Sequence, residues 1–365
     1  MANYNTQTYN SICENENITN HDIQALINVI KIQIPKNLRK WVHFGLTSQD
    51  INSPAMVLMY KNYIENIFYG DIRILKHSIK QLYIDNFEML SFTHGQPATP
   101  IMLKNMFSVH LVNIENIILD LYDHKWTTKM GGSNGQLSAL KKTFPTVNWE
   151  FIISKLLRSH SLSRNMFTTQ IDNYSNYFKL FQILERFCYI LINFCQDIWL
   201  YCSKEYFVLK NIKNEVGSSA MPHKINPIQF ENAEGNLKLS ASIFHTIGQN
   251  ICLCRLQRDL TDSTLLRNVG VACGHLTLAI RNIVNGLHRI SINKTHIQAD
   301  LNENSIIKME YIQLFFRKWG IENGYDVCKE FSRGKKTLNI PDFFKFLENK
   351  DIVLSDENKK EIEKL

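Results

Sequence analysis

Residues 181–202 read FQILERFCYILINFCQDIWLYC, and they form the most hydrophobic run in this chain of 365 residues. Most of the run is large and apolar, but polar side chains interrupt it, among them Glu185, Arg186, Asn193 and Asp197. A membrane-spanning helix needs a nearly uninterrupted apolar stretch, so the run does not predict one. The pattern instead predicts a long helix buried in a helical bundle.

Three cysteines in this run follow heptad spacing, at Cys188, Cys195 and Cys202. They could ligate a metal, but small thiols packed against a neighbouring helix are the preferred interpretation. None of the chain's eight cysteines belongs to a C-x-x-C pair, and no secretory or targeting segment is visible at the start. The sequence therefore predicts free thiols and a cytoplasmic protein.

The helical pattern continues through most of the chain. Three dipeptides pair a capping residue with proline, a common helix start: Ser53-Pro54, Thr99-Pro100 and Asn226-Pro227. The predicted long helices cover about residues 56–89, 99–124, 174–207, the segment after 227, and 263–289. Gly70 is a predicted interruption of the first. Helices of about 25 residues exceed the usual mean of about 11–12, which indicates an elongated bundle.

The predicted fold class is all-α, with a long central helical bundle and smaller helical domains at both ends. From about Ser291 the segments become shorter and more charged, which favours a separate C-terminal domain. We predict the remainder of an N-terminal helical domain at 1–45, the bundle at 46–290, and an incomplete C-terminal helical domain at 291–365.

Composition and charge indicate which kind of partner the protein binds. Hydrophobic content of 44% and charged content of 21% are typical of a soluble globular protein. The formal net charge is +7, but the lysines are spread out and form no basic block. We therefore expect a local positive potential for an anionic small molecule, with neither nucleic acid nor a membrane as partner.

The loop at 217–227, GSSAMPHKINP, places two hydroxyls, an imidazole, an ammonium and an amide within eleven residues. Asn226-Pro227 then reads as the start of a helix. Unpaired backbone N–H groups and the helix dipole both favour an anion at such a place. The sequence therefore predicts an anion site, and His223 is expected to shape the loop.

Three more polar clusters precede predicted helices, at 47–50 (TSQD), 93–100 (THGQPATP) and 258–264 (RDLTDST). One such cluster alone is a capping motif, and Thr47-x-x-Asp50 is a fair capping box. Four clusters rich in hydroxyls and cations predict the walls of one site for an anionic ligand. The glycine-rich stretch at 130–135 lacks the Gly-Lys-Ser/Thr ending of a phosphate loop and is predicted to be a turn.

These strings resemble a known family. The 217–227 loop matches the signature of the fumarase/aspartase superfamily, whose members eliminate fumarate from a substituted succinate. Four further strings make the chain resemble the bacterial-type branch of the adenylosuccinate lyase family: TNHD (19–22), THGQPATP (93–100), PIQFENAEGN (227–236) and QRDLTDSTLLRN (257–268). The resemblance covers nearly the whole chain. It implies cleavage of adenylosuccinate to AMP and fumarate in purine nucleotide biosynthesis, without metal or organic cofactor.

The resemblance also implies a role for each site residue. Ser218 is the implied base for a weakly acidic C–H, and His94 the general acid for the departing purine nitrogen. Lys224 and Asn226 are implied to hold the carboxylate on which charge develops. The other implied substrate contacts are Ser219, Thr47 and Ser48 at the succinyl group, Gln170 and Asn232 elsewhere, Asn20, His21 and Asp22 at the nucleotide, Arg258, Ser263 and Arg267 at the phosphate, and Thr264 beside them. His43, His110 and His245 are predicted to be structural.

Compared with the family, the chain is expected to lack both ends: an upstream Arg-Tyr substrate contact and a closing Tyr-Gly segment. Phe92 stands where the family often has arginine, two residues before His94. A second elimination, on the succinylated aminoimidazole carboxamide ribotide, is also implied. The family assembles a homotetramer in which three subunits build each active site, so Thr47, Ser48, His94 and Ser218 are expected to meet across chains.

Two alternatives stay open. Argininosuccinate lyase shares the loop but is expected to lack a nucleotide-phosphate site. A non-catalytic homologue such as a lens crystallin is the other, although the joint presence of Ser218, His94 and Lys224 argues against it.

Overall fold

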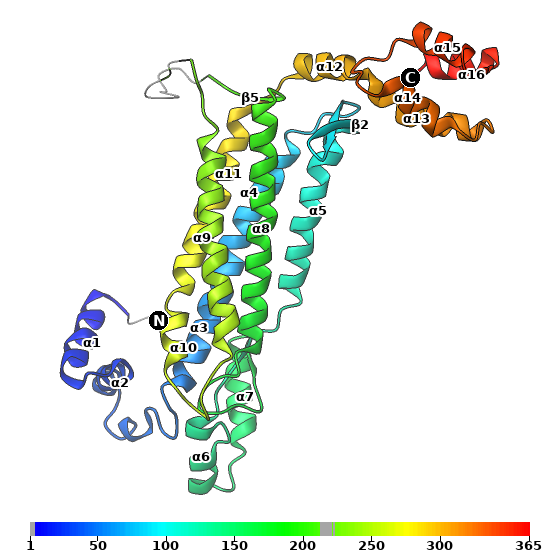
Figure 1. The fold of residues 1–365 in the computed structure, drawn as a ribbon. Coiled ribbons are helices and arrows are strands. Elements are labelled where there is room, and N and C mark those ends of the chain that lie inside the picture. Colours follow the sequence, from blue (N-terminus) through cyan, green and yellow to red (C-terminus); the bar gives the residue numbers. More distant parts are fainter. Residues whose placement is uncertain (1–3, 212–220, 222) are drawn as a thin grey trace. The chain divides into compact units, whose positions relative to one another are not determined.

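The computed structural model describes residues 4–211, 221 and 223–365, and Figure 1 shows the order of its elements along the chain. The described residues form helices joined by loops, with three two-stranded sheets among them, and the predicted all-α class is confirmed. The chain divides into two compact units. Unit 1 comprises Met1–Asp71, Ile117–Cys188 and Lys238–Thr277, and unit 2 comprises Ile72–Asn116, Tyr189–Leu237 and Leu278–Leu365.

Unit 1 is built from paired short helices and from segments of the long ones. Its elements are α1 (Thr6–Thr19), α2 (Asp22–Gln33), η1 (Arg39–Trp41), α3 (Gln49–Tyr63), the π-helical η2 (Ile64–Phe68), β3 (Thr127–Thr128), η3 (Gly132–Asn134), α6 (Ser138–Thr143), α7 (Trp149–Ser159), β4 (Ser163–Arg164), α10 (Thr261–Leu266) and parts of α8 (Ser175–Ser203), α9 (Ile228–Ile251) and α11 (Val269–Arg289). Helices α1 and α2 pack against each other (Figure 1). Buried rings fill the core: Phe68 meets Phe187 at 5.1 Å between centroids, and Phe181 stacks on Phe244 at 6.0 Å.

Unit 2 combines the remaining parts of the long helices with a hairpin and a group of short helices. Its other elements are α4 (Tyr69–Lys80), β1 (Glu88–Thr93), β2 (Gln96–Met102), α5 (Leu103–Tyr122), β5 (Phe207–Leu209), β6 (Ile290–Ile292), α12 (Lys294–Glu303), η4 (Ser305–Lys308), α13 (Met309–Lys318), α14 (Gly324–Ser332), α15 (Ile340–Glu348) and α16 (Asp356–Glu363). The first residues of α4 and the last of α5 belong to unit 1. Polar pairs join the helices of unit 2, because His110 Nε2 lies 3.0 Å from Asp197 Oδ2 and Ser78 Oγ lies 3.3 Å from His288 Nε2.

The short helices from α13 onward bury a hydrophobic cluster of their own. Its members are Met309, Ile312, Phe316, Val327, Cys328, Phe331, Phe343, Leu347, Leu354 and Ile362. This agrees with the change to shorter, more charged segments near Ser291. The proposed domain boundaries at residues 45 and 290 remain a prediction.

Two of the three predicted helix starts are wrong. Helix α3 already begins at Gln49 and contains Pro54, and the Asp50 carboxylate in its first turn accepts from the N–H of Thr47 just ahead of the helix. Thr99 and Pro100 lie in strand β2, where Pro100 pairs with Leu90, and α5 begins at Leu103. A proline preceded by an extended residue fits an edge strand as well as a helix start.

The third start is confirmed, since α9 begins at Ile228 directly after Asn226-Pro227. The first long helix ends at Lys80 instead of reaching residue 89, and residues 88–93 form β1. Its interruption is the π-helical segment η2, which ends just before Tyr69 and Gly70. The predicted helix at 174–207 is α8 (Ser175–Ser203), and that at 263–289 is divided into α10 and α11.

The cysteines of α8 are core residues, as predicted. Cys188 and Cys195 are buried and Cys202 is half-buried, and the thiol of Cys188 donates to Ser240 Oγ at 3.5 Å. Burial raises the pKa of Cys188 to about 12 and that of Cys202 to about 11, so both stay protonated at neutral pH. All eight cysteines are free thiols. Within the described residues, no helix has the length and apolar character that crossing a bilayer requires.

Candidate active site

The predicted site residues are divided between the two units. Unit 1 holds Asn20, His21, Asp22, Thr47, Ser48, Gln170, Arg258, Ser263, Thr264 and Arg267. Unit 2 holds His94, Lys224, Asn226 and Asn232. The implied base Ser218 and its neighbour Ser219 lie outside the described residues.

His94 occupies the turn of the β1–β2 hairpin. Thr93 pairs with Gln96 across this turn, so His94 and Gly95 are its two central residues. Both have positive φ, 51° and 72°, as a tight two-residue hairpin turn of the favoured twist requires. Glycine adopts this conformation freely, whereas histidine does so at some cost, and the hairpin holds the His94 imidazole in an exposed position.

Lys224 and Asn226 line a cavity of about 400 Å³ in unit 2. Lys224 is exposed and Asn226 is half-buried, just before the first turn of α9. The other lining residues are Trp199, Cys202, Ser203, Phe207, Val208, Leu209, His223, Ile225, Pro227 and Glu231. Trp199 Nε1 donates to Glu231 Oε1 at 3.0 Å, which fixes a carboxylate on the cavity wall. The sequence did not single out Trp199 or Glu231 for a role.

Asn232, one turn into α9, is held by two neighbouring amides. Its Oδ1 accepts from Asn282 Nδ2 at 2.7 Å and from Asn236 Nδ2 at 3.0 Å. With Oδ1 used as an acceptor on both sides, the amide nitrogen of Asn232 is oriented as a donor.

Asn20, His21 and Asp22 lie exposed at the junction of α1 and α2. Asn20 ends α1 in the left-handed region, at φ 49°, and His21 is the N-cap of α2. The N–H of Gln24 donates to His21 Nδ1 at 3.4 Å, and Asp22 lies in the first helical turn, where its charge favours the helix dipole. This junction places three polar side chains on one short exposed segment.

Thr47 is held by a buried carboxylate. Asp50 Oδ2 accepts from Thr47 N at 2.7 Å and from Thr47 Oγ1 at 3.2 Å. Its other oxygen, Oδ1, accepts from the N–H groups of Gly131 and Gly132 at 2.7 and 3.1 Å. The predicted turn at 130–135 therefore wraps around Asp50, and Ser48 follows Thr47 in the same half-buried segment.

Lys129 completes this arrangement, because its ammonium lies 2.7 Å from Asp50 Oδ1 and both side chains are fully buried. It also donates to Gly132 O at 2.7 Å and to Thr47 Oγ1 at 3.4 Å. Burial lowers the pKa of Lys129 below its usual 10.5, while the neighbouring Asp50 opposes that shift. A buried ion pair of this kind is costly to break, since either partner alone leaves an uncompensated charge.

Ser53 connects the pair to a second buried carboxylate. Its hydroxyl lies 2.8 Å from Thr128 Oγ1, accepts from Lys129 N at 3.2 Å and donates to Asp172 Oδ2 at 3.4 Å. Asp172 also accepts from Asn165 Nδ2 at 2.9 Å. Burial raises the pKa of Asp172, and its hydrogen bonds oppose that shift.

Arg258 is held at the other end of the same cluster. Its Nη1 donates to Asp262 Oδ2 at 3.1 Å, and the Tyr174 hydroxyl donates to the same oxygen at 2.6 Å. The Tyr174 N–H in turn donates to Asp172 Oδ1 at 3.0 Å. A chain of hydrogen bonds thus links Thr47 to Arg258, and the structure brings these two predicted contacts into one cluster. We call it the buried polar network, made of Thr47, Asp50, Ser53, Lys129, Asp172, Tyr174, Arg258 and Asp262.

The remaining predicted contacts lie near the ends of this network. Ser263 is half-buried in α10, and its N–H donates to Asp262 Oδ1 at 2.7 Å. Thr264 is exposed on the same helix, and Arg267 is exposed at its C-cap. Gln170 donates from Nε2 to Ser133 O at 3.1 Å, next to the turn that wraps around Asp50.

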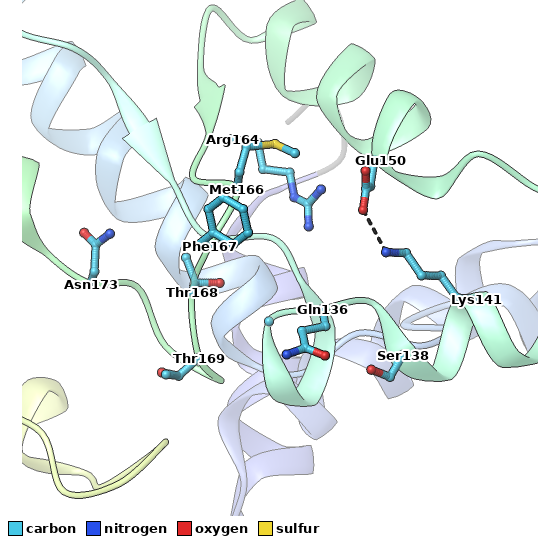
Figure 2. Close-up of a pocket in the computed structure, with 11 residues that line it drawn as sticks. Gln136, Ser138, Lys141, Glu150, Arg164, Met166, Phe167, Thr168, Thr169 and Asn173 are labelled. Atoms are coloured by element: carbon cyan, nitrogen blue, oxygen red, sulfur yellow. Dashed lines mark hydrogen bonds and ion pairs between the residues drawn. The ribbon is translucent and has the colours of Figure 1, made fainter.

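A second cavity, of about 610 Å³, lies in unit 1 (Figure 2). Its lining residues are Gly135, Gln136, Ser138, Lys141, Glu150, Arg164, Met166, Phe167, Thr168, Thr169 and Asn173. Figure 2 shows Lys141 paired with Glu150, at 2.7 Å, across from the Arg164 guanidinium. Arg164 Nε donates to Met130 O at 3.0 Å. Thr169 is the neighbour of Gln170, but none of the predicted contacts themselves is among these lining residues.

Sequence reasoning missed most of the buried polar network. Asp50 appeared only as a helix cap, and Lys129, Asp172 and Tyr174 attracted no prediction. These residues can be recognised only from the structure, because polar and charged residues far apart in the chain meet there in a buried place. By contrast, His110 and His245 are confirmed in structural contacts with Asp197 and Glu185, at 3.0 and 2.9 Å. Among the described residues, no three His, Cys, Asp or Glu side chains lie close enough to hold a metal ion.

Two models of protein families match this chain. A model of a lyase family, described as "Lyase", matches residues 2–240, and one described as "Adenylosuccinate lyase C-terminal" matches residues 254–365. Adenylosuccinate lyase from Dictyostelium discoideum is 38% identical over 351 residues, which are 92% of this chain and 75% of that protein. The Escherichia coli K12 protein of the same name is 36% identical over 328 residues, covering 88% and 72% of the two chains.

Solved structures agree on the fold. The 3-carboxy-cis,cis-muconate lactonizing enzyme from Pseudomonas putida superposes with a TM-score of 0.76 at 17% identity, over 99% of this chain and 81% of that one. At this identity the likeness concerns the fold alone. The sequence matches to relatives and to both family models decide the family. This chain belongs to the adenylosuccinate lyase family of the fumarase/aspartase superfamily.

Proposed function

We propose that this chain is an adenylosuccinate lyase, which cleaves adenylosuccinate to AMP and fumarate. The observation that carries the proposal is the match to relatives of that name across about nine tenths of the chain. The buried polar network supports it further, because it holds Thr47 and Arg258, which the family resemblance assigns to opposite ends of the substrate. The same proposal includes the second elimination, from the succinylated aminoimidazole carboxamide ribotide.

The proposed reaction breaks one C–H and one C–N bond. Ser218 takes the proton from the carbon next to the one that carries the C–N bond, and the electron pair left there forms the new double bond of fumarate as the C–N bond breaks. His94 gives a proton to the purine nitrogen, so charge is balanced on both fragments. An exposed hairpin turn suits this role, since the imidazole can reach a bound ligand without leaving a packed core.

Binding is divided among cationic and neutral donors. Lys224 supplies a point charge and Asn226 an amide to the carboxylate that becomes more negative as the proton leaves. Ser219, Thr47 and Ser48 bind the succinyl group, and Gln170 and Asn232 bind elsewhere on the substrate. Asn20, His21 and Asp22 bind the nucleotide side, and Arg258, Ser263, Thr264 and Arg267 bind the phosphate side. No metal or organic cofactor takes part in this proposal.

The proposed assembly is a cytoplasmic homotetramer in which three subunits contribute to each active site. Light scattering of the purified protein, combined with activity across a dilution series, tests this assembly. Activity should fall as tetramers dissociate. Full activity in a verified monomer would contradict the shared site.

The decisive experiment incubates the purified chain separately with adenylosuccinate and argininosuccinate and measures fumarate and the second product. Adenylosuccinate should yield equal amounts of AMP and fumarate, and argininosuccinate should be unchanged. Cleavage of argininosuccinate alone would instead identify the argininosuccinate lyase activity. Cleavage of neither by a folded tetramer would favour the non-catalytic, crystallin-like alternative.

A further inference from the structure

Asp262 is a carboxylate only 4% exposed in the first turn of α10, and it receives three hydrogen bonds. Tyr174 donates to Oδ2 at 2.6 Å, Arg258 donates to Oδ2 at 3.1 Å, and Ser263 N donates to Oδ1 at 2.7 Å. Tyr174 lies 88 positions away in the sequence. The carboxylate is therefore fixed from its own helix and from a distant part of unit 1.

Tyr174 is itself rigidly placed. Its side chain is 2% exposed, its N–H donates to Asp172 Oδ1 at 3.0 Å, and its ring meets Tyr177 edge-on at 5.1 Å. Its backbone has φ 58°, a left-handed conformation that costs a non-glycine residue about 1 kcal/mol or more. Burial raises the pKa of Tyr174 above its usual 10.0, so the hydroxyl is a proton donor at neutral pH.

Arg258 has the opposite character, because its side chain is 23% exposed and so reaches the surface from the buried carboxylate. A guanidinium presents five N–H donors in one plane and can bind a second anion while it remains bonded to the first. Without Asp262, a long arginine side chain at the surface would sample many rotamers. The ion pair restricts it to the orientation that Asp262 sets.

We propose that Tyr174 and Asp262 are positioning residues, which hold the Arg258 guanidinium ready for the phosphate group of the substrate. This inference rests on the proposed function, in which Arg258 binds on the phosphate side. Tyr174 fixes the carboxylate, and the carboxylate fixes Arg258. Neither residue is required to touch the reacting atoms.

The test replaces Tyr174 by phenylalanine, which removes one hydroxyl and keeps the ring. Tyr60→Phe is the matched control, since Tyr60 is also buried and its hydroxyl has no hydrogen-bond partner among the described residues. Kinetics are measured on the tetramer with adenylosuccinate and with its dephosphorylated nucleoside. Tyr174→Phe should raise KM for adenylosuccinate roughly 5- to 10-fold, with kcat within about 2-fold and KM for the nucleoside unchanged. Tyr60→Phe should change neither substrate's KM.

A merely structural role of Tyr174 predicts a different pattern, with both substrates affected equally or only the melting temperature lowered. Either result, or an unchanged KM for adenylosuccinate, overturns the inference. Asp262→Asn, which keeps an acceptor but removes the charge, should raise the same KM by more than Tyr174→Phe does. Wild-type protein that does not cleave adenylosuccinate counts against the proposed function alone. Calorimetric binding then decides the inference, because Tyr174→Phe should weaken AMP binding and leave adenosine binding unchanged.

Discussion

Two predicted site residues of unit 1, Thr47 and Arg258, are held differently from two of unit 2, His94 and Lys224. In unit 1, Thr47 and Arg258 bond to the buried carboxylates of Asp50 and Asp262. In unit 2, His94 and Lys224 are exposed, on a hairpin turn and on the segment that leads into α9. Groups fixed before the ligand arrives bind without a further loss of side-chain entropy, whereas exposed groups lose that freedom on binding. We infer that Thr47 and Arg258 are preformed binding contacts, whereas His94 and Lys224 become ordered with the ligand.

The largest expected effect concerns the proposed acid of unit 2. His94→Asn removes the proposed proton donor and keeps a residue that tolerates the positive φ of the turn. We expect kcat to fall about 10²- to 10⁴-fold, because a general acid contributes about that much. The free energy of unfolding should change by no more than about 0.5 kcal/mol, since the side chain is exposed.

Steady-state kinetics and urea unfolding measure the two quantities for His94→Asn. His160→Asn is the control, because His160 is also exposed and lies outside every predicted contact. A kcat close to that of the wild type would remove His94 from the proposed mechanism. A large loss of stability would show that the exposed turn is as tightly held as unit 1.

The second prediction exchanges one lysine in each unit for methionine. Lys129→Met leaves the Asp50 carboxylate buried without its ion-pair partner, and we expect about 3–5 kcal/mol of destabilisation. Lys224→Met alters an exposed cation, so stability should stay within about 0.5 kcal/mol while activity falls. Urea unfolding of both variants, with kinetics, separates the two effects. Equal losses of stability would break the distinction between a buried and an exposed set of residues.

The sequence predicted the bundle better than the site within it. Long amphipathic segments such as α8 follow from periodicity, and the start of α9 follows from Asn226-Pro227, because both signals are local. Thr99-Pro100 gave a wrong helix start because its signal is also local: an extended residue before proline fits a strand as well as a helix start. Pairing with Leu90 decided between them, and that contact is not local.

The buried polar network shows more clearly which features of the site the sequence alone could not predict. Asp50 carried a local signal, as the capping box with Thr47, and this bond is present in the structure. Lys129 and Tyr174 carried none, because a lone lysine or tyrosine is ordinarily read as a surface or core residue. Their importance comes from the place where separate helices and loops of unit 1 meet. Resemblance to a family predicted the residues that contact the substrate, but not those that hold them in place.

The third prediction concerns pH and the buried His124 of unit 1. Burial, with a smaller contribution from Lys179, lowers the pKa of His124 to about 4 from its usual 6.5. Between these two values the unfolded chain binds a proton that the folded chain does not, so stability falls as the pH is lowered through this range. We expect a loss of about 1–2 kcal/mol between pH 7 and pH 5 from this residue.

Urea unfolding of wild type and His124→Phe at several pH values tests this loss. Phenylalanine keeps a ring against Trp126, whose centroid lies 4.7 Å from the imidazole, and removes the titration. The variant should therefore lose less stability than the wild type between pH 7 and pH 5. Identical pH profiles would show that water reaches His124 and that unit 1 is less well sealed than its burial indicates. His94→Asn, altered at an exposed histidine, is the matched control.

The smallest expected effect concerns Asn232, a predicted contact of unit 2 whose side chain is held by neighbouring amides. Asn282 donates to Asn232 Oδ1 at 2.7 Å, so Asn282→Ala should let the Asn232 amide turn more freely. We expect KM to rise about 2- to 5-fold with kcat unchanged, the size of one modest hydrogen bond. Stability should not fall, because alanine is the better helix former within α11.

Asn250→Ala is the control, since its side chain bonds only to its own helix in the described structure, at Thr246 O. A raised KM for Asn282→Ala, with no change for Asn250→Ala, would mean that Asn232 is also a preformed binding contact. Preformed contacts would then occur in both units. An unchanged KM would mean that Asn232, like His94 and Lys224, takes up its position with the ligand, in contrast to Thr47 and Arg258 of unit 1.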